Sequence, residues 1–378
     1  MPKRQDRRRD LVALARLFAW LSVTAFGGPA SHIAMMRREL VERRGWLSDT
    51  EFLDLLGASN VIPGPTSTEV AMHVGRRRAG VAGLVVCGVA FIGPAAVIVG
   101  ILAVCYRRYG TTPAVGDIFD GIKPVVVAIV AIAVIRLSQA AIRSASLAVI
   151  AAAVLALYLA GINEPVLLLA AAAVAALASG SPRPDTIASV ALIAAPAVAG
   201  VHTEHADIPR IFALFFKIGA LLFGSGYVLL AFLRRDLVIS RGWLTNTQLL
   251  DAIAVGQFTP GPLFTTATFV GYLLGGTPGA VAATVGIFLP SFLMVAALEP
   301  VIARMRRSGA TAAALDGLNT GAVALMAGVT WFLGRDAIVD LPTALLAAAA
   351  AITLVRWKLN PVWMIALGAV VGLLIHAG

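Results

Sequence analysis

The feature that most constrains the fold is a Pro-Gly-Pro tripeptide that occurs twice within apolar stretches, at residues 63–65 and 260–262. Proline removes a backbone hydrogen-bond donor and glycine tolerates unusual dihedral angles, so each tripeptide must interrupt a helix. The two tripeptides are 197 residues apart, and the same offset carries Arg-Gly-Trp at 44–46 onto Arg-Gly-Trp at 241–243. Two motifs in one fixed register indicate an internal duplication.

The composition places this duplicated chain in a membrane. Of the 378 residues, 59% are hydrophobic and 13% are charged, whereas soluble domains carry roughly 25% charged residues. The net charge of +10 is gathered in short basic clusters between apolar runs, as at 37–44 and 234–241. Such clusters are typical of anchors that flank membrane spans and face anionic lipid. We therefore expect the lipid bilayer as a partner, and no nucleic acid.

Apolar segments of helical length predict an all-α, polytopic membrane protein of two homologous repeats, which we place at 1–200 and 201–378. In each repeat two short apolar helices meet at the Pro-Gly-Pro break, as a re-entrant pair, because they are too short to cross a core of about 30 Å. These pairs are 51–62 with 66–78, and 248–258 with 263–275. About ten full spans are expected besides: 11–36, 79–105, 121–142, 145–161, 164–180, 208–233, 277–303, 315–334, 342–356 and 361–377.

The orientation of the repeats depends on the apolar run at 186–201. If this run does not cross the membrane, an odd number of spans separates equivalent points and the second repeat is inverted. If it crosses, the repeats are parallel. We favour inversion, because paired interrupted helices in inverted repeats are typical of secondary transporters.

The breaks predict a site for a small oxyanion. A helix that begins after a break presents unsatisfied N–H groups and the positive end of its dipole. Hydroxyl and amide side chains near both breaks add donors, so the candidate binding residues are Asn60, Pro63, Gly64, Pro65, Thr66, Ser67, Thr68, Gln257, Pro260, Gly261, Pro262, Thr265 and Thr266. The alternative is that the breaks only kink helices and the hydroxyls bond backbone carbonyls. Backbone could also approach the anion at Gly27, Gly28, Gly224 and Gly226, although such glycines equally serve tight helix packing.

Several charged residues are candidates for gating or coupling. A carboxylate beside an anion pocket repels the anion unless it is protonated, so Glu69 is a candidate proton-coupling group; alternatively it pairs with Arg76 to Arg78 on the surface. Lys217 lies inside an apolar span. A lysine there indicates a functional site by default, and the alternative is that its side chain extends from the helix end to the membrane surface. Interfacial ion pairs or an electrostatic gate are expected from Arg38, Glu39, Arg235 and Asp236.

Enzyme chemistry and bound cofactors are not expected. His202, Glu204, His205 and Asp207 have a spacing that could suit a metal, but they lie in the linker between repeats and have no counterpart in the other copy. We interpret them as a solvated loop, and expect neither metal nor cofactor. His32 and His73 are isolated, and neither forms a triad with a plausible serine.

The order of the motifs resembles the chromate ion transporter (CHR) family in its long, two-repeat form. The resemblance rests on Phe26-Gly-Gly-Pro29, His32-Ile-Ala34, Arg-Gly-Trp46 and Pro63-Gly-Pro65, and on the second-repeat motifs. It implies a multi-pass carrier of the inner membrane that exports chromate, confers chromate resistance and couples to the proton gradient. Sulfate has the same shape and charge, so a sulfate-type uptake carrier stays open, as does an anion channel. A homodimer is one assembly that the sequence leaves open.

Overall fold

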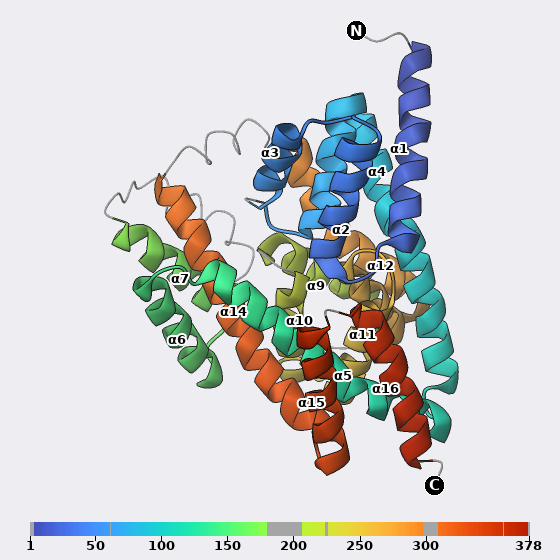
Figure 1. Cartoon of the computed structure of the whole chain (residues 1–378), viewed down its shortest axis with the longest axis vertical. Coiled ribbons are helices and arrows are strands. Elements are labelled where there is room, and N and C mark those ends of the chain that lie inside the picture. The colour runs from blue at the N-terminus through green and yellow to red at the C-terminus, as the bar shows by residue number, and fades with distance from the viewer. Residues whose placement is uncertain are drawn as a thin grey trace. The chain divides into compact units, whose positions relative to one another are not determined.

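The structure is a computed structural model that describes residues 4–60, 62–179, 206–223, 226–297, 309–357 and 359–376. Within these ranges every regular element is a helix, which confirms the all-α prediction (Figure 1). The apolar run 186–201, on which the orientation of the repeats depends, lies outside the described residues.

Four helical stretches are long and apolar enough to cross a membrane: α4 (Thr66–Tyr109), α5 (Pro113–Ala141), the stretch Leu263–Ala297 that contains α12 (Thr266–Ala297), and α14 (Gly309–Ala337). Four further predicted spans form shorter helices, which are α6 (Ala145–Leu159), α7 (Glu164–Ala178), α15 (Leu341–Arg356) and α16 (Pro361–His376). At 1.5 Å per residue these reach only about 22–24 Å. Side-chain caps fix where two of them begin, because Ser144 and Asp340 accept hydrogen bonds from the first-turn amides of Leu147 and Thr343. The prediction of about ten full spans therefore overstates the number of long helices among the described residues.

The first predicted span of each repeat is interrupted. Residues 11–36 divide into α1 (Arg4–Thr24) and α2 (Gly28–Arg37), because Gly27 and Gly28 adopt φ of +97° and +80°, which L-residues rarely adopt. Residues 208–233 divide likewise into α9 (Ile208–Leu221), the 3₁₀ turn η3 (Gly226–Val228) and α10 (Leu229–Leu233). A π-helical segment follows in each repeat, η1 (Arg38–Arg43) or η4 (Arg234–Ile239), and then the short helix α3 (Asp49–Ser59) or α11 (Asn246–Phe258).

A sharp turn divides α4 at Gly80 and α12 at Gly276, where φ is +66° and +62°. Gly75 and Gly83 lie against each other across the first turn, whereas eight residues of straight helix would hold them about 12 Å apart. Gly271 and Gly279 make the equivalent contact in the second repeat. The segments 66–78 and 81–109 therefore form a helical hairpin, so the tight reversal of the chain follows the short helix that begins at the Pro-Gly-Pro break.

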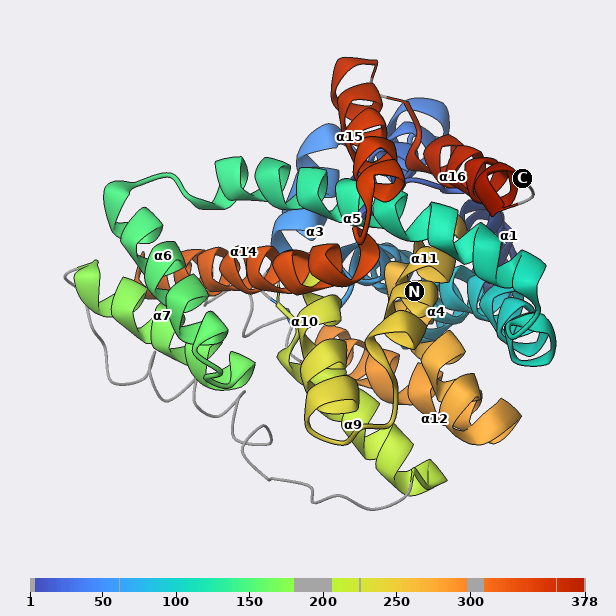
Figure 2. The same ribbon diagram turned by 90° about the horizontal axis from the view of Figure 1, so that it is seen from below.

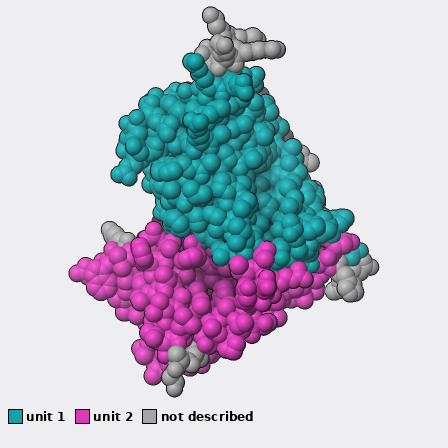
Figure 3. Space-filling model, turned by 90° about the vertical axis from the view of Figure 1, so that its right-hand side faces the viewer, with its two compact units in different colours: residues 1–102, 208–226, 259–307 teal, residues 103–207, 227–258, 308–378 magenta. Residues whose placement is uncertain are grey.

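Two compact units make up the chain, and each combines segments of both expected repeats (Figure 3). The first unit comprises 1–102, 208–226 and 259–307, and the second comprises 103–207, 227–258 and 308–378. In the first unit, Phe18, Phe52 and Phe91 are buried in one hydrophobic cluster that joins α1, α3 and α4. In the second unit, α14 packs against α5, α6 and α7, and α5 packs against α15 and α16 (Figure 2).

Candidate functional site

Four helix interruptions lie in the first unit. Two of them follow the first helix of each repeat, after α1 at residues 25–27 and after α9 at 222–223. The other two are the Pro-Gly-Pro breaks that precede α4 and α12, where Gly64 and Gly261 have φ of +139° and +89°. All residues of both tripeptides are buried, so their backbone groups have little access to water and must find partners within the protein.

The interruptions are hydrogen-bonded across the two repeats. The Gly64 N–H donates to the Leu222 carbonyl at 2.7 Å, and the Gly261 N–H donates to the Ala25 carbonyl at 3.1 Å. Gly261 and Leu222 follow Gly64 and Ala25 by the same 197 residues that relate the repeats. The two bonds are therefore equivalent, with donor and acceptor exchanged between repeats, which is the pattern that a two-fold relation produces.

The first turn of α4 holds buried polar groups that lack partners. Thr68 and Glu69 are 0% exposed, and neither the Thr68 hydroxyl nor either Glu69 carboxyl oxygen has a hydrogen-bond partner among the described residues. The Ser291 hydroxyl lies beside the Glu69 carboxyl but donates to the Pro63 carbonyl at 3.3 Å. An unsatisfied buried polar group costs about 1–3 kcal/mol, so the site is suited to receive a proton or a polar ligand.

The first turn after the second break has its hydroxyl groups satisfied. Thr265 donates to the Pro262 carbonyl and Thr266 to the Leu263 carbonyl, both at 2.8 Å. In this conformation their hydrogens are bonded to backbone, as the alternative interpretation of the sequence expects. The two breaks are thus matched in backbone geometry but differ in the polar groups that they leave open.

Other predicted binding residues are spread more widely. Thr66 is half-buried at the start of α4, and Asn60 is exposed at the end of α3. Gln257 is buried in α11, beside the Tyr227 hydroxyl, and both belong to the second unit. Gly28 begins α2 and Gly226 begins η3, whereas Gly224 lies outside the described residues.

The predicted acid–base neighbours find different partners from those expected. Glu39 is buried and is bound by Arg43 at 2.6 Å and Arg44 at 3.4 Å, while Arg38 is exposed. Residues adjacent in a helix point in different directions, so residues four or five positions apart meet instead. Arg44 also lies 5.1 Å from the centre of the Trp46 ring, so the Arg-Gly-Trp motif binds the acid through its arginine.

The second repeat makes the equivalent contact within the second unit. Arg241 lies 3.1 Å from the Asp236 carboxylate and 5.3 Å from the Trp243 ring centre. Arg235 turns to another acid, Glu164, at 3.9 Å. Lys217, the lysine predicted inside an apolar span, is half-buried in α9.

A family model described as chromate transporter matches residues 12–177 and again residues 209–373. The chain belongs to the chromate transporter family. It is 30% identical over 377 residues to the chromate transport protein of Cupriavidus metallidurans, covering 96% of this chain and 92% of the relative. It is 35% identical over 384 residues to the chromate transport protein of Pseudomonas aeruginosa, covering 95% and 91%.

A shorter relative, the uncharacterized transporter YwrA of Bacillus subtilis, is 28% identical over 159 residues, covering 41% of this chain and 89% of its own. No solved structure matches the chain. The family and the apolar helices identify a multi-pass membrane transport protein, not an enzyme, as the sequence predicted.

One residue that contacts the candidate site was not predicted from the sequence. His32 in α2 is buried, with Nε2 3.1 Å from the Ala25 carbonyl and Nδ1 3.3 Å from the Ser67 hydroxyl. A carbonyl only accepts, so Nε2 carries the hydrogen and, in the neutral ring, Nδ1 accepts from Ser67. His32 thereby connects the first turn of α4 to the carbonyl that also binds Gly261. Its position one turn after a glycine break was the available indication.

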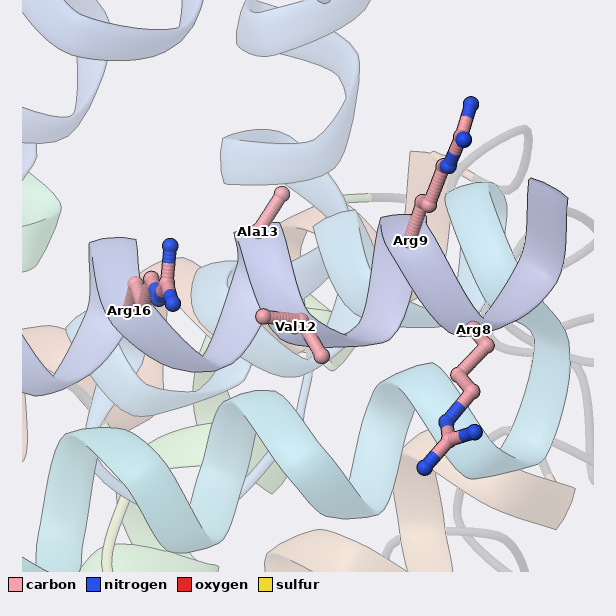
Figure 4. A pocket seen from close by; sticks show the side chains of 5 residues that line it. All are labelled: Arg8, Arg9, Val12, Ala13 and Arg16. Carbon is pink, nitrogen blue, oxygen red and sulfur yellow. The ribbon is translucent and has the colours of Figure 1, made fainter. Parts of the chain in front are cut away.

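The basic N-terminal turns of the transporter form a separate surface. Arg8, Arg9 and Arg16 line a shallow hollow on α1 together with Val12 and Ala13 (Figure 4). Their exposed guanidinium groups next to apolar side chains suit the headgroup level of a bilayer. A role of these arginines in anchoring the chain at the membrane stays a prediction.

Metal ligands do not gather in the part of the transporter that the structure describes, where no group of three histidine, cysteine or acidic side chains could hold an ion. His202, Glu204 and His205 of the predicted linker cluster lie outside the described residues.

Proposed function

We propose that the transporter exports chromate or a similar tetrahedral oxyanion across the inner membrane, driven by the proton gradient, and so confers chromate resistance. The observation that carries the proposal is the pair of matched helix N-termini buried in one unit. At one of them the Thr68 hydroxyl and the Glu69 carboxyl have no hydrogen-bond partner among the described residues. The names of the full-length relatives support chromate as the substrate.

The donors suit an anion that must be both bound and released. Helix N-termini attract negative charge through N–H groups and the helix dipole, without a fixed cation that would hold a dianion too tightly. The Thr68 hydroxyl adds a donor whose hydrogen is not committed to another residue. Ser67 can join when its hydroxyl rotates away from His32.

Glu69 supplies the coupling in this proposal. An ionised carboxylate next to a bound dianion is repelled, whereas a protonated carboxyl becomes a hydrogen-bond donor to the same anion. Binding of the anion and binding of a proton at Glu69 therefore favour each other. A dianion that leaves together with one proton carries a net charge of −1, and the membrane potential, negative inside, is the part of the proton gradient that drives this charge outward. The Ser291 hydroxyl lies beside this carboxyl and adds no charge that would neutralise it.

We further propose that the repeats are inverted, so that they exchange conformations as the site opens to either side. The reciprocal bonds Gly64–Leu222 and Gly261–Ala25 support a two-fold relation. An axis in the membrane plane would place the site near the midplane, as in other transporters with interrupted helices.

The test uses purified transporter in proteoliposomes, with labelled chromate or sulfate and several imposed pH gradients. Wild-type protein should carry chromate in preference to sulfate, with a flux that depends on the gradient. Glu69→Gln should abolish that dependence, while Glu42→Gln, which removes an exposed carboxylate of η1, should behave as wild type. Equal chromate flux in empty and loaded liposomes would refute transport, and a gradient dependence retained in Glu69→Gln would refute the coupling role.

A further inference from the structure

The second unit, which contains neither of the helix N-termini proposed to bind the anion, holds a buried carboxylate with no cation in close contact. Asp251 of α11 has a side chain that is 5% exposed. The Tyr106 hydroxyl donates to its Oδ2 at 2.6 Å. Its Oδ1 has no hydrogen-bond partner among the described residues, and the nearest cation, the Lys123 ammonium of α5, is 3.8 Å from that oxygen.

Lys123 is shared between two acids. Its Nζ is 2.8 Å from Asp120, whose side chain is 50% exposed, and is therefore held more closely by the exposed acid than by the buried one. The three groups together carry one excess negative charge when all are ionised. A buried charge without a close partner costs several kcal/mol, which a bound proton removes.

The groups that act on the Asp251 carboxyl are Tyr106, Lys123 and Asp120. The neighbouring η4 directs its charged residues elsewhere, because Arg234 lies over the Phe332 ring, Arg235 lies toward Glu164 and Asp236 lies toward Arg241. The described parts of α16 contribute no acidic or basic side chain to this region. The charge at Asp251 is therefore set by one lysine, one exposed aspartate and one phenol.

The cluster joins the two repeats, because Asp251 belongs to the second and Tyr106, Asp120 and Lys123 belong to the first, and the exchanged copy does not have the same residues. The equivalent of Asp251 is Asp54, which is exposed, and Asn319 stands in place of Lys123 at the offset of 196 residues that carries Asp120 onto Asp316. A contact that the repeated fold itself required would be expected in both copies. Its restriction to one copy, together with a buried acid, is typical of a functional site.

We propose that Asp251 is a second proton-binding site of the transporter, with Asp120 as its exposed entrance and Lys123 as the switch between the two acids. A proton that arrives from water adds to Oδ1 of Asp251 and removes the attraction that holds Lys123 near it. Lys123 then stays with Asp120, while the Tyr106 hydroxyl keeps its bond to Oδ2. When the proton leaves, Lys123 is drawn back.

The role of this site in transport rests on the proposed function, but its protonation can be measured without any substrate. Infrared difference spectra of reconstituted protein, recorded between high and low pH, report the carbonyl stretch of a protonated carboxyl group. The spectra are recorded on the Glu69→Gln variant, so that Glu69 contributes no band. A carbonyl band that titrates in this variant and is lost in Glu69→Gln/Asp251→Asn supports the site. If the added Asp251→Asn substitution leaves the spectrum unchanged, the proposal is overturned.

The transport arm compares Asp251→Asn with Asp54→Asn, the exposed equivalent. We expect Asp251→Asn to lose at least fivefold of the gradient-driven flux while chromate binding stays within twofold of wild type, and Asp54→Asn to keep both. Equal fluxes in the two variants would overturn the coupling role. If Asp251→Asn does not insert, Tyr106→Phe decides: a shifted pH profile of flux supports the site, and an unchanged profile overturns it. Absence of any flux in wild type would refute the proposed function and leave the infrared result to stand alone.

Discussion

Gly64 is the position at which a single methyl group should be most damaging. Its φ of +139° lies in a region that is essentially restricted to glycine, which costs about 1–3 kcal/mol for other residues. A Cβ there would overlap the Ser291 hydroxyl and the Glu69 carboxyl, and overpacking a tight site costs a further 1–3 kcal/mol, roughly. Gly64→Ala should therefore destabilise the transporter by about 2–6 kcal/mol and displace Glu69 from its place at the break.

The assay compares Gly64→Ala with two other glycines by thermal unfolding in detergent and by chromate flux in proteoliposomes. Gly45 has φ of +57° with no heavy atom within 4 Å of an added Cβ, so Gly45→Ala measures backbone strain alone, about 1–2 kcal/mol. Gly93 lies inside a helix with open space around it, so Gly93→Ala should be neutral or slightly stabilising. Because the added Cβ displaces Glu69 from the break, Gly64→Ala should also lower the chromate flux per folded transporter, by more than Gly45→Ala does. Unfolding and flux no worse than those of Gly45→Ala would show that the close packing at the break is not as described.

Two further predictions concern hydrogen bonds to side chains. In His32→Asn the amide oxygen lies near the place of Nδ1 and can still accept from Ser67, whereas in His32→Gln the amide can still reach the Ala25 carbonyl but not Ser67. We therefore expect a higher KM for chromate in His32→Gln than in His32→Asn. Equal KM values would show that His32 has no role in anion binding. In α3, hydrogen bonds from Ser48, first from its backbone N–H, hold the pKa of the Glu51 carboxyl below its ordinary value. The stability that Glu51 contributes is therefore complete above the ordinary carboxyl pKa and is lost as the pH falls through the lowered folded value, so the unfolding temperatures of wild type and Glu51→Gln should converge in acid; a constant difference would contradict this.

The duplication let the sequence predict where the chain breaks. Glycine and proline act on local dihedral angles, so Gly27, Gly64 and Gly261 indicated interruptions that the structure contains. The family followed from the order of those motifs, and the comparisons confirm it.

Partners across the chain could not be predicted in the same way. A repeat offset relates Gly64 to Gly261 but does not say that each binds the first interruption of the other repeat. His32 was set aside as isolated because its neighbours, Ala25 and Ser67, come together only through the broken helices.

The exchange of backbone bonds between Gly64–Leu222 and Gly261–Ala25 has a consequence for half-length chains such as YwrA. A polypeptide with a single repeat has one such N–H donor, at its break glycine, and one such carbonyl acceptor, at its first interruption. In the two-repeat chain each of these groups bonds to the other repeat. Left alone, its buried amide would forfeit about 1–3 kcal/mol. A single-repeat chain should therefore be unstable until it associates with a second chain. In the two-repeat form both partners belong to one polypeptide, so the same contact forms within a single molecule.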